Sequence, residues 1–359
     1  MKTPPAKSKK PAVVKMSDLA KLAGVSKATV SRALSGSELI NPATREKIQA
    51  LAKQYNYRLN TQARNFRLKE SLTITVIIPS AESAKWQISD PFFLELLGSI
   101  SVCLMEKGHE MLLSAVDFHL PDKTSGLSKI NSDGIIVIGQ SYIHKGLNEY
   151  ARSHPQLVVW GARMEDQDYC CVGGDNLRGG LLATQHLIER GCKHIAIIGD
   201  REVPEGNLRY QGYLRALQDA GIERNPALEI SIGSQKNEGY DATLLLLSRG
   251  VKFDGIFLLS DALAMASISA LDEHGIAVPK DVAIVGYDDI SLARYYTPSI
   301  TSVHQDREIG GRLLVEKLLQ LIDGQEVESF TMPTNLVVRK SSKKTTQATV
   351  TQHPADNRE

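Results

Sequence analysis

Residues 16–34 read MSDLAKLAGVSKATVSRAL, and this stretch decides how the start of the chain folds. Two short amphipathic patterns lie on either side of Gly24, a residue that permits a tight turn. Ser17 and Ser26 are good N-caps. We therefore predict one helix from Ser17 to about Gly24 and a second helix from Ser26 to Leu34.

A third helix is predicted where Asn41 is the N-cap and Pro42 takes the first helical position, and its pattern ends near Tyr55. The segment from Thr61 to Leu68 is too short to be a stable helix alone, because nucleation outweighs propagation at that length. The apolar positions of the first two helices can form an internal core: Leu19, Ala20, Ala23, Val25, Val30 and Leu34.

The second predicted helix has an outer face rich in hydrogen-bond donors, formed by Lys27, Ala28, Thr29, Ser31 and Arg32. Reading the major groove of DNA requires a short exposed helix that a second helix holds at a fixed angle. Arg32 could pair with guanine, and the small Ala28 permits close approach or contact with a thymine methyl. The alternative is an ordinary helical hairpin with a solvated basic face. Turn, cap, spacing and local charge together favour DNA binding.

The net charge of +1 hides a strong asymmetry along the chain. Residues 1–70 carry fifteen Lys and Arg against four acidic residues, a balance of +11, and residues 71–359 carry the other 27 against 37, a balance of −10. Phosphates attract the basic head, while the acidic body resists lying on DNA. The lysine- and proline-rich residues 1–15 are expected to form a disordered basic arm.

Neither a secretion signal nor a membrane span is evident in the sequence. The basic start has no apolar core of signal-peptide length, and no later run approaches the roughly 18 apolar residues that span a bilayer. We therefore expect a cytoplasmic, nucleoid-associated bacterial protein without a membrane partner. The four cysteines lack any Cys-x-x-Cys spacing, and we expect buried free thiols rather than a metal site or a disulfide: Cys103, Cys170, Cys171 and Cys192.

From Leu72 the pattern changes to buried strands that alternate with amphipathic helices, which predicts parallel sheets covered on both faces. Two such sheets fit the length better than one. The strand candidates are 73–80, 110–116, 134–139, 157–160, 194–199, 228–232, 255–259 and 282–286. The helix candidates are 92–107, 176–190, 208–220, 240–248, 262–274 and 308–322.

The basic head contains the motifs Asp18-Leu-Ala, Ala23-Gly-Val-Ser, Thr29-Val-Ser-Arg-Ala-Leu, Thr44-Arg-Glu-Lys and Asn56-Tyr-Arg-Leu-Asn60. Together these motifs resemble those of one known family, the lac repressor/galactose repressor (LacI/GalR) family. The resemblance is specific over Met16–Arg67 and more diffuse up to about Arg339. It implies a ligand-responsive transcriptional regulator, usually a homodimer on double-stranded operator DNA, whose body is similar to periplasmic sugar-binding proteins.

The resemblance also implies a fold class and a domain order. An all-α helix-turn-helix headpiece (16–60) and a hinge helix or linker (61–71) precede an α/β sensor of two Rossmann-like parallel-sheet subdomains (72–340). The sensor is expected to bind the effector and to dimerise, with 72–160 plus 290–322 in one subdomain and 161–289 plus 323–340 in the other. The polar residues 341–359 are expected to be a disordered tail. They lack the leucine heptads of tetrameric relatives, which favours a dimer.

By the same resemblance, Lys27, Ala28 and Arg32 occupy base-reading positions of the recognition helix. The positions that resemble phosphate contacts are Thr29, Ser31, Asn41, Thr44, Tyr57 and Asn60, and Ser17 is counted with the DNA-binding residues. Hydroxyls and amides at helix starts suit phosphate oxygens, so the physical interpretation agrees.

Residues 60–67 lie where the family has its hinge helix, and Ala63, Arg64 and Phe66 are the DNA-binding candidates there. Phe66 falls at the position of an apolar wedge between base pairs, where relatives more often carry leucine. The alternative is that Phe66 packs against its own sensor domain. A hinge this short is expected to become ordered only when dimer and DNA are both present.

Arg209 begins Arg-Tyr-Gln-Gly-Tyr213, which resembles the family's Arg-x-x-Gly-aromatic element, and Asp288 matches a second effector-holding position. An arginine and an aspartate that face each other suit a polyol. Trp160, at a predicted strand end, could stack on a sugar face. The other effector candidates are Phe92, Phe93, Ser260 and Asp261. Structural ion pairs and plain core packing are the alternatives for the charged and the aromatic candidates.

Two residues near these positions depart from what relatives carry, namely Ala262 and Arg307. The class of effector is therefore open. A sugar or sugar derivative is the first choice, and a nucleobase or a phosphorylated metabolite is the alternative.

Nothing in the sequence favours catalysis. Residues 173–180 are glycine-rich but lack the Gly-Lys-Ser/Thr ending of a phosphate loop, and neither a nucleophile elbow nor a metal-ligand spacing is present. We expect no enzyme activity, no cofactor and no metal ion. A solute-binding transport protein would lack the basic head, and a sugar-processing enzyme would need an acid, base or nucleophile cluster. The predicted function is a repressor whose DNA affinity is coupled to effector binding.

Overall fold

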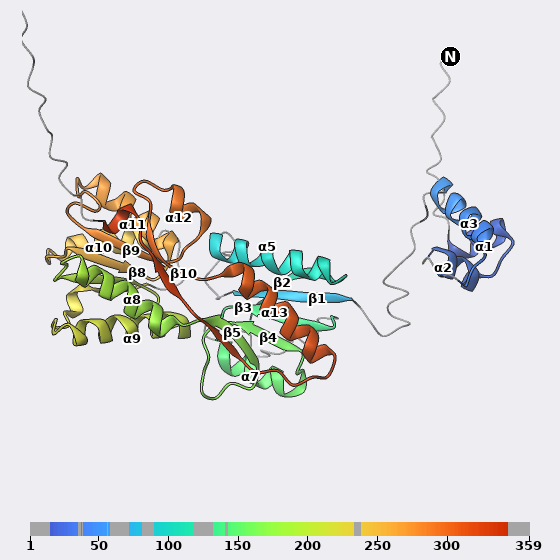
Figure 1. Ribbon diagram of the computed structural model, residues 1–359, viewed down its shortest axis with the longest axis horizontal. Coiled ribbons are helices and arrows are strands. Elements are labelled where there is room, and N and C mark those ends of the chain that lie inside the picture. Colours follow the sequence, from blue (N-terminus) through green and yellow to red (C-terminus); the bar gives the residue numbers. More distant parts are fainter. Residues whose placement is uncertain are drawn as a thin grey trace, which may run out of the picture. The chain divides into compact units, whose positions relative to one another are not determined.

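The computed structural model describes residues 15–34, 37, 39–55, 57, 72–80, 90–117, 132–140, 143–232 and 238–343. The chain divides into two compact units, Met1–Ser71 and Leu72–Glu359, which are described separately (Figure 1).

The first unit contains helices α1 (Met16–Ala23), α2 (Lys27–Leu34) and α3 (Pro42–Gln54). They enclose a small core in which Leu19, Val30, Ala33 and Ile48 are completely buried. Gly24 ends α1 in a left-handed conformation, with φ of 71°, which a glycine adopts without steric cost.

Local capping sets the helix bounds in this unit. The Ser26 hydroxyl accepts a hydrogen bond from the Thr29 amide (3.1 Å), and the Asn41 side chain accepts one from the Ala43 amide (3.0 Å). The expectation that Ser17 caps α1 is wrong. The helix begins one residue earlier, because the Asp18 carboxylate accepts a hydrogen bond from the amide of Lys15 (2.9 Å), which is the N-cap.

The second unit contains two six-stranded sheets. The strand order in the first is β11 (Phe330–Met332), β5 (Cys170–Gly174), β4 (Leu157–Trp160), β3 (Gly134–Ile138), β1 (Thr73–Ser80) and β2 (Glu110–Asp117). All the pairings are parallel. Helices α5 (Pro91–Glu106) and α13 (Arg307–Ile322) lie side by side on one face, and α7 (His144–Ser153) covers the other (Figure 1).

The strand order in the second sheet is β12 (Asn335–Val337), β10 (Thr301–His304), β9 (Ala283–Asp288), β8 (Gly255–Leu258), β6 (Ile195–Gly199) and β7 (Glu229–Ser231). Only the pairing of β12 with β10 is antiparallel. Helices α8 (Asn176–Glu189) and α9 (Pro204–Asp219) pack on one face. Helices α10 (Glu238–Ser248) and α11 (Asp261–Glu273) pack on the other, and the short α12 (Ser291–Tyr295) follows β9. The predicted class, a helical headpiece and an α/β body of two parallel-sheet subdomains, is confirmed.

The chain crosses between the sheets three times, after β5, after β10 and after β11. The expected subdomain bounds therefore need correction. Strand β5 pairs with β4 and belongs to the first sheet, although 161–289 was expected in the second subdomain. Strand β10 belongs to the second sheet, and β11 returns to the first beside β5. These memberships depend on pairing between distant segments, which local patterns do not reveal. We call the first sheet with α5, α7 and α13 the first subdomain, and the second sheet with α8 to α12 the second subdomain.

The expected start of the disordered tail at residue 341 is also wrong. Residues Lys340–Ser342 form a 3-10 turn, in which Ser341 and Ser342 are buried. The Ser341 hydroxyl donates to the carbonyl of Ile284 (2.7 Å), and the Ser342 hydroxyl is hydrogen-bonded to His186 (2.7 Å). The four cysteines are free and buried. No helix among the described residues is long and apolar enough to span a bilayer.

Candidate DNA-binding face and effector site

The predicted base-reading residues share the exposed face of α2. Lys27, Ala28 and Arg32 are exposed, while Val30 and Ala33 on the opposite face are completely buried against α1 and α3. Because these positions recur at helical spacing, two exposed cations and a small residue lie together on one side. This geometry is what a helix that enters a major groove requires.

Three of the predicted phosphate-contacting residues, Thr29, Asn41 and Thr44, lie at or near helix starts. Thr29 and Ser31 are half-buried on α2, Thr44 is half-buried on α3, and Asn41 is the exposed cap of α3. Tyr57 is half-buried against the headpiece core. The remaining predicted contacts lie outside the described residues and stay predictions: Asn60, Ala63, Arg64 and the wedge candidate Phe66.

Arg209, on α9, is held on several sides. Its Nε donates to the side-chain oxygen of Asn176 (2.8 Å), and its Nη1 donates to the carbonyl of Leu259. Nη2 lies 3.8 Å from the Asp288 carboxylate, and the guanidinium lies over the ring of Tyr287. Two of the predicted effector residues, Arg209 and Asp288, are thus neighbours.

Asp288 is the last residue of β9 and has φ of 100°, a conformation that non-glycine residues rarely adopt. Its side chain is buried and accepts a hydrogen bond from the Gln305 amide (2.8 Å). Burial raises the pKa of Asp288 to about 7, although the charge of Arg209 opposes this shift. A carboxyl group in this state can either accept or donate a hydrogen bond near neutral pH.

The charge of Arg209 also acts on two further carboxyl groups, Asp90 and Glu205, and neither was among the predicted site residues. Asp90 caps α5 in the first subdomain, where its side chain accepts from the Phe92 amide (2.8 Å). Glu205 precedes Arg209 by one turn of α9, and its carboxylate accepts from the amide of Gln140 in the first subdomain (3.5 Å). The pKa of each group is raised, mainly because burial disfavours the charged form. The positive charge of Arg209 offsets only part of this shift. The pair Asp90-Pro91 is a helix-start signal that could have located the first group.

Ser260 stabilises the start of α11, and Asp261 stabilises the loop after β9. The Ser260 hydroxyl accepts from the Leu263 amide (3.2 Å) and so caps the helix. Asp261 is completely buried, and its Oδ2 accepts from the Ile290 amide (2.9 Å). Burial raises the pKa of Asp261 well above its usual range. This enclosure favours a structural role for Asp261 over direct contact with an effector.

Two aromatic candidates lie in the core of the first subdomain. Phe92 and Trp160 are 5% and 4% exposed, and their ring centroids are 5.8 Å apart. Trp160 also contacts α13 at Gly310, where an added Cβ would lie 2.4 Å from the indole ring. These contacts favour core packing, the alternative that the sequence left open. Phe93 is only partly buried, and it packs edge-on against Phe92.

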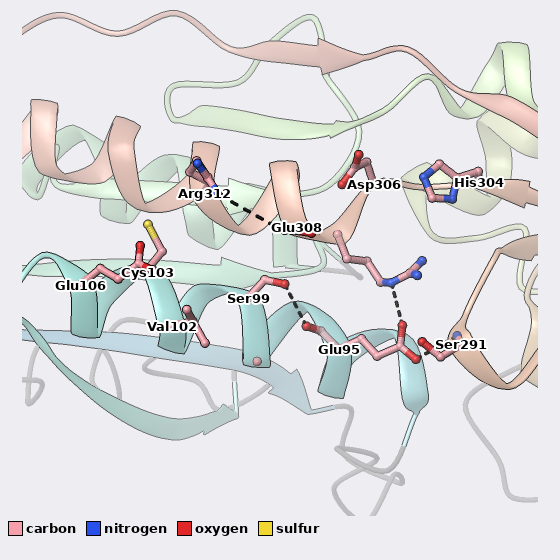
Figure 2. A pocket seen from close by; sticks show the side chains of 12 residues that line it. Glu95, Ser99, Val102, Cys103, Glu106, Ser291, His304, Asp306, Glu308 and Arg312 are labelled. Carbon is pink, nitrogen blue, oxygen red and sulfur yellow. Dashed lines mark hydrogen bonds and ion pairs between the residues drawn. The ribbon is translucent and has the colours of Figure 1, made fainter.

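A groove of about 660 Å³ lies between α5 and α13 (Figure 2). Glu95 lies at one end of it, beside Ser291 of the second subdomain, and Arg312 lies further along α13. None of the predicted effector residues lines this groove, so it is separate from the cluster around Arg209 and Asp288. Among the described residues no group of three or more His, Cys, Asp or Glu could hold a metal ion.

Known protein families match both the headpiece and the sensor of this chain. Residues 15–60 match the family model of bacterial regulatory proteins of the lacI family, and residues 184–342 match that of the periplasmic binding protein-like domain. The chain is 30% identical over 339 residues to the HTH-type transcriptional repressor PurR of Haemophilus influenzae (strain PittEE), covering 91% of this chain and 98% of the relative. The chain belongs to the LacI family.

Solved LacI-family structures share the architecture of this regulator. A complex of the transcriptional regulator CelR with cellobiose matches with a TM-score of 0.67 and 29% identity, over 91% of this chain and 99% of that one. The lac repressor dimer bound to operator and the anti-inducer ONPF matches with a TM-score of 0.77 and 25% identity, over 92% and 99%. The family consists of DNA-binding transcriptional regulators and not of enzymes, which confirms two predictions from the sequence.

Proposed function

We propose that this LacI-family regulator is a homodimeric repressor whose affinity for operator DNA changes when a sugar or sugar derivative binds between its two sensor subdomains. The observation that carries the proposal is the cluster around Arg209. Asp288 of the second subdomain lies 3.8 Å from this guanidinium, and the charge of Arg209 also acts on Glu205 of the second subdomain and on Asp90 of the first. A ligand held by these groups would touch both halves of the sensor.

The charge of the cluster supports a polyol over an anion. Three carboxyl groups lie within the electrostatic influence of a single guanidinium, and that guanidinium already donates to Asn176 and Leu259. Carboxylates and amide oxygens accept hydrogen bonds from hydroxyls, which a sugar supplies in pairs. A phosphorylated metabolite would instead bring further negative charge beside Asp90, Glu205 and Asp288. The CelR structure, which holds cellobiose, agrees with this choice of ligand class.

Exposed apolar side chains support a dimer. Leu94, Val102 and Met105 of α5 and Leu112 and Leu113 of the edge strand β2 are each between 37% and 70% exposed. A monomer rarely leaves such a patch in water, and an edge strand invites pairing unless something covers it. We therefore assign this α5–β2 patch to the interface with a second copy of the chain, as suits two headpieces on one duplex.

The proposed mechanism is thermodynamic linkage. A ligand that binds one arrangement of the subdomains more tightly than the other shifts the protein toward that arrangement. The change in operator affinity cannot exceed this difference in ligand affinity, and such coupling is typically about 1–3 kcal/mol. The same coupling makes operator DNA change the affinity for the ligand by an equal factor. We place the protein in the bacterial cytoplasm, at the nucleoid, because its proposed partner is chromosomal DNA.

The proposal is tested by thermal unfolding of the full chain with cellobiose, ribose, glucose 6-phosphate and adenine, each added separately. We expect a neutral sugar to raise the unfolding temperature, because a ligand that binds only the folded state stabilises it. The same sugar should alter operator affinity measured by fluorescence anisotropy. Stabilisation by adenine or glucose 6-phosphate alone would overturn the proposed ligand class. A sugar that binds without any change in operator affinity would overturn the proposed linkage.

A further inference from the structure

Arg307 is a departure from the family pattern, and its guanidinium binds backbone carbonyl groups. It is the first residue of α13, where the chain has just crossed from the second sheet to the first. Its Nη1 donates to the carbonyls of Asp288 and Gln305, and its Nη2 donates to the carbonyl of Asp289 (3.0 Å). The side chain is 14% exposed. A planar guanidinium can bind several carbonyls at once, whereas a lysine ammonium offers a single point charge.

Two of these carbonyls belong to a strained stretch of backbone. Asp288 and Asp289 have φ values of 100° and 53°, and neither is a glycine. Such conformations persist where the surrounding structure over-determines them. Here Arg307 holds the carbonyls, while His304 and Arg339 hold the Asp289 carboxylate at 2.9 and 2.6 Å. The conformation of Asp288 sets the direction of its carboxyl group toward Arg209, so these contacts determine the geometry of the effector cluster.

Glu95 extends this set of contacts to the other subdomain. One carboxylate oxygen lies 2.8 Å from the Nε of Arg307, and the other accepts a hydrogen bond from the Ser291 amide (2.9 Å). Figure 2 shows Glu95 on α5 next to Ser291, with the ion pair drawn as a dashed line. Glu95 thus joins α5 of the first subdomain to both the first residue of α13 and the first residue of α12.

We propose that Arg307 and Glu95 are positioning residues for the effector site. Arg307 holds the Asp288–Asp289 backbone so that the Asp288 carboxyl group meets Arg209, and Glu95 ties this loop to the first subdomain. Neither residue is an effector ligand in this arrangement. The inference rests on the proposed function, because it assumes that an effector binds at the Arg209–Asp288 cluster.

The first test needs no effector. Hydrogen exchange is measured by mass spectrometry on the ligand-free full chain as wild type, Glu95→Gln and Arg307→Met. Arg307 and the Ser291 amide meet different oxygens of Glu95, so a glutamine would present its NH2 group, which is a donor, to one of these two donors. We expect the peptide over residues 288–292 to exchange about tenfold faster in both variants, because charge-assisted hydrogen bonds are lost.

Arg312→Met is the matched control for this measurement. Arg312 lines the same groove, but it is exposed and pairs only loosely with Glu308, at 4.0 Å. Its variant should leave exchange of residues 288–292 unchanged. The proposal is overturned if Glu95→Gln and Arg307→Met also leave this peptide unchanged, or if the control accelerates exchange as much as they do.

The second test uses cellobiose and ribose as probes in calorimetry. With whichever sugar binds the wild type, both variants should raise the Kd about tenfold. A purely structural ion pair would lower the unfolding temperature without changing the Kd for the sugar, and that outcome would refute the positioning role. If neither sugar binds the wild type, these sugars fail as effectors, while the exchange measurement still decides whether Arg307 and Glu95 hold the loop.

Discussion

The guanidinium of Arg209 lies over the ring of Tyr287, with its Cζ 3.6 Å from the ring centroid. The tyrosine is completely buried, and burial raises its pKa to about 12, so its ring is neutral at physiological pH. A cation above an aromatic face is attracted by the electrons of the ring, more strongly when water is excluded. The contact therefore fixes the plane of the guanidinium and directs Nη2 to Asp288.

Replacement of Arg209 by lysine tests this geometry. An ammonium group cannot reproduce the forked bonds to Asn176 and Leu259 together with the ring contact, so the sugar site loses its fixed donor. We expect affinity for the sugar found by thermal shift to fall roughly 100-fold, in line with the loss of charge-assisted hydrogen bonds. Calorimetry measures the change, with the exposed Arg215→Lys as control. Equal affinities of Arg209→Lys and the wild type would show that Arg209 does not hold the sugar.

Tyr287 also restricts which residue can stand at position 179, a glycine of α8. A Cβ added at this position of α8 would lie 2.3 Å from the tyrosine hydroxyl. We expect Gly179→Ala to lower the free energy of unfolding by about 2 kcal/mol, as overpacking of a close-packed interior does. Urea unfolding measures the change. Gly98→Ala on α5 is the control, because its Cβ meets nothing within 4 Å, and we expect a gain of about 0.5–1 kcal/mol.

The pH dependence of stability should reveal Asp288. Burial raises its pKa to about 7 in the folded protein, against about 3.9 in an unfolded chain. Between these values the folded state holds a proton that the unfolded state has lost. The contribution of Asp288 to the free energy of unfolding therefore falls as pH rises through this window, by up to about 1.4 kcal/mol per pH unit. Above both values the contribution becomes constant.

Asp288→Asn removes this contribution. Urea unfolding of the full chain between about pH 5 and pH 8 should show the wild type losing stability relative to the variant as pH rises to about 7. The exposed Asp219→Asn is the control and should follow the wild-type curve. A difference between wild type and Asp288→Asn that is flat or of opposite sign would contradict the raised pKa.

The headpiece could be predicted from sequence in detail because its bounds depend on local capping, as at Ser26 and Asn41. In the sensor, continuous apolar runs predicted most strands, but β5, which reads Cys-Cys-Val-Gly-Gly, and β10, which reads Thr-Ser-Val-His, were both missed. The three-residue edge strands β11 and β12 are too short to carry a pattern. The glycines at 179 and 180, which looked like a fragment of a phosphate loop, are instead required by close contact with Tyr287 and with the Arg209 backbone.

The candidate site was predicted only in part, for a related reason. Arg209 and Asp288 were found through motifs, and the structure brings them together. Asp90, Glu205 and Gln305 were missed, because isolated polar residues carry no sign of which distant strand end they will meet. Trp160 was an effector candidate through its place at a strand end, but tertiary packing against Phe92 and α13 buries it.

The α5–β2 patch should control the oligomeric state. Met105 is the most exposed residue of the patch, at 70%, and a glutamate there would place a charge in an apolar interface. We expect Met105→Glu to weaken dimerisation at least tenfold in analytical ultracentrifugation, and to weaken operator binding in parallel. Leu245→Glu is the control, since this residue is also exposed but lies on α10. Dimerisation unchanged by Met105→Glu would place the interface elsewhere.

Arg32 and Lys53 are both exposed cations of the headpiece, but only Arg32 lies on the outer face of α2 with Lys27 and Ala28. A base-reading arginine contributes discrimination between sequences, whereas a cation that meets phosphate alone contributes affinity for any duplex. We therefore expect Arg32→Ala to weaken binding to the cognate operator by about 1–3 kcal/mol and to leave binding to a scrambled duplex nearly unchanged. Lys53→Ala should change both affinities little. Fluorescence anisotropy at several salt concentrations distinguishes a base-reading residue from a phosphate contact, because loss of a phosphate contact lowers the slope of log K against log salt by about one. Equal losses on cognate and scrambled DNA would remove Arg32 from the base-reading face and assign it to the phosphate backbone.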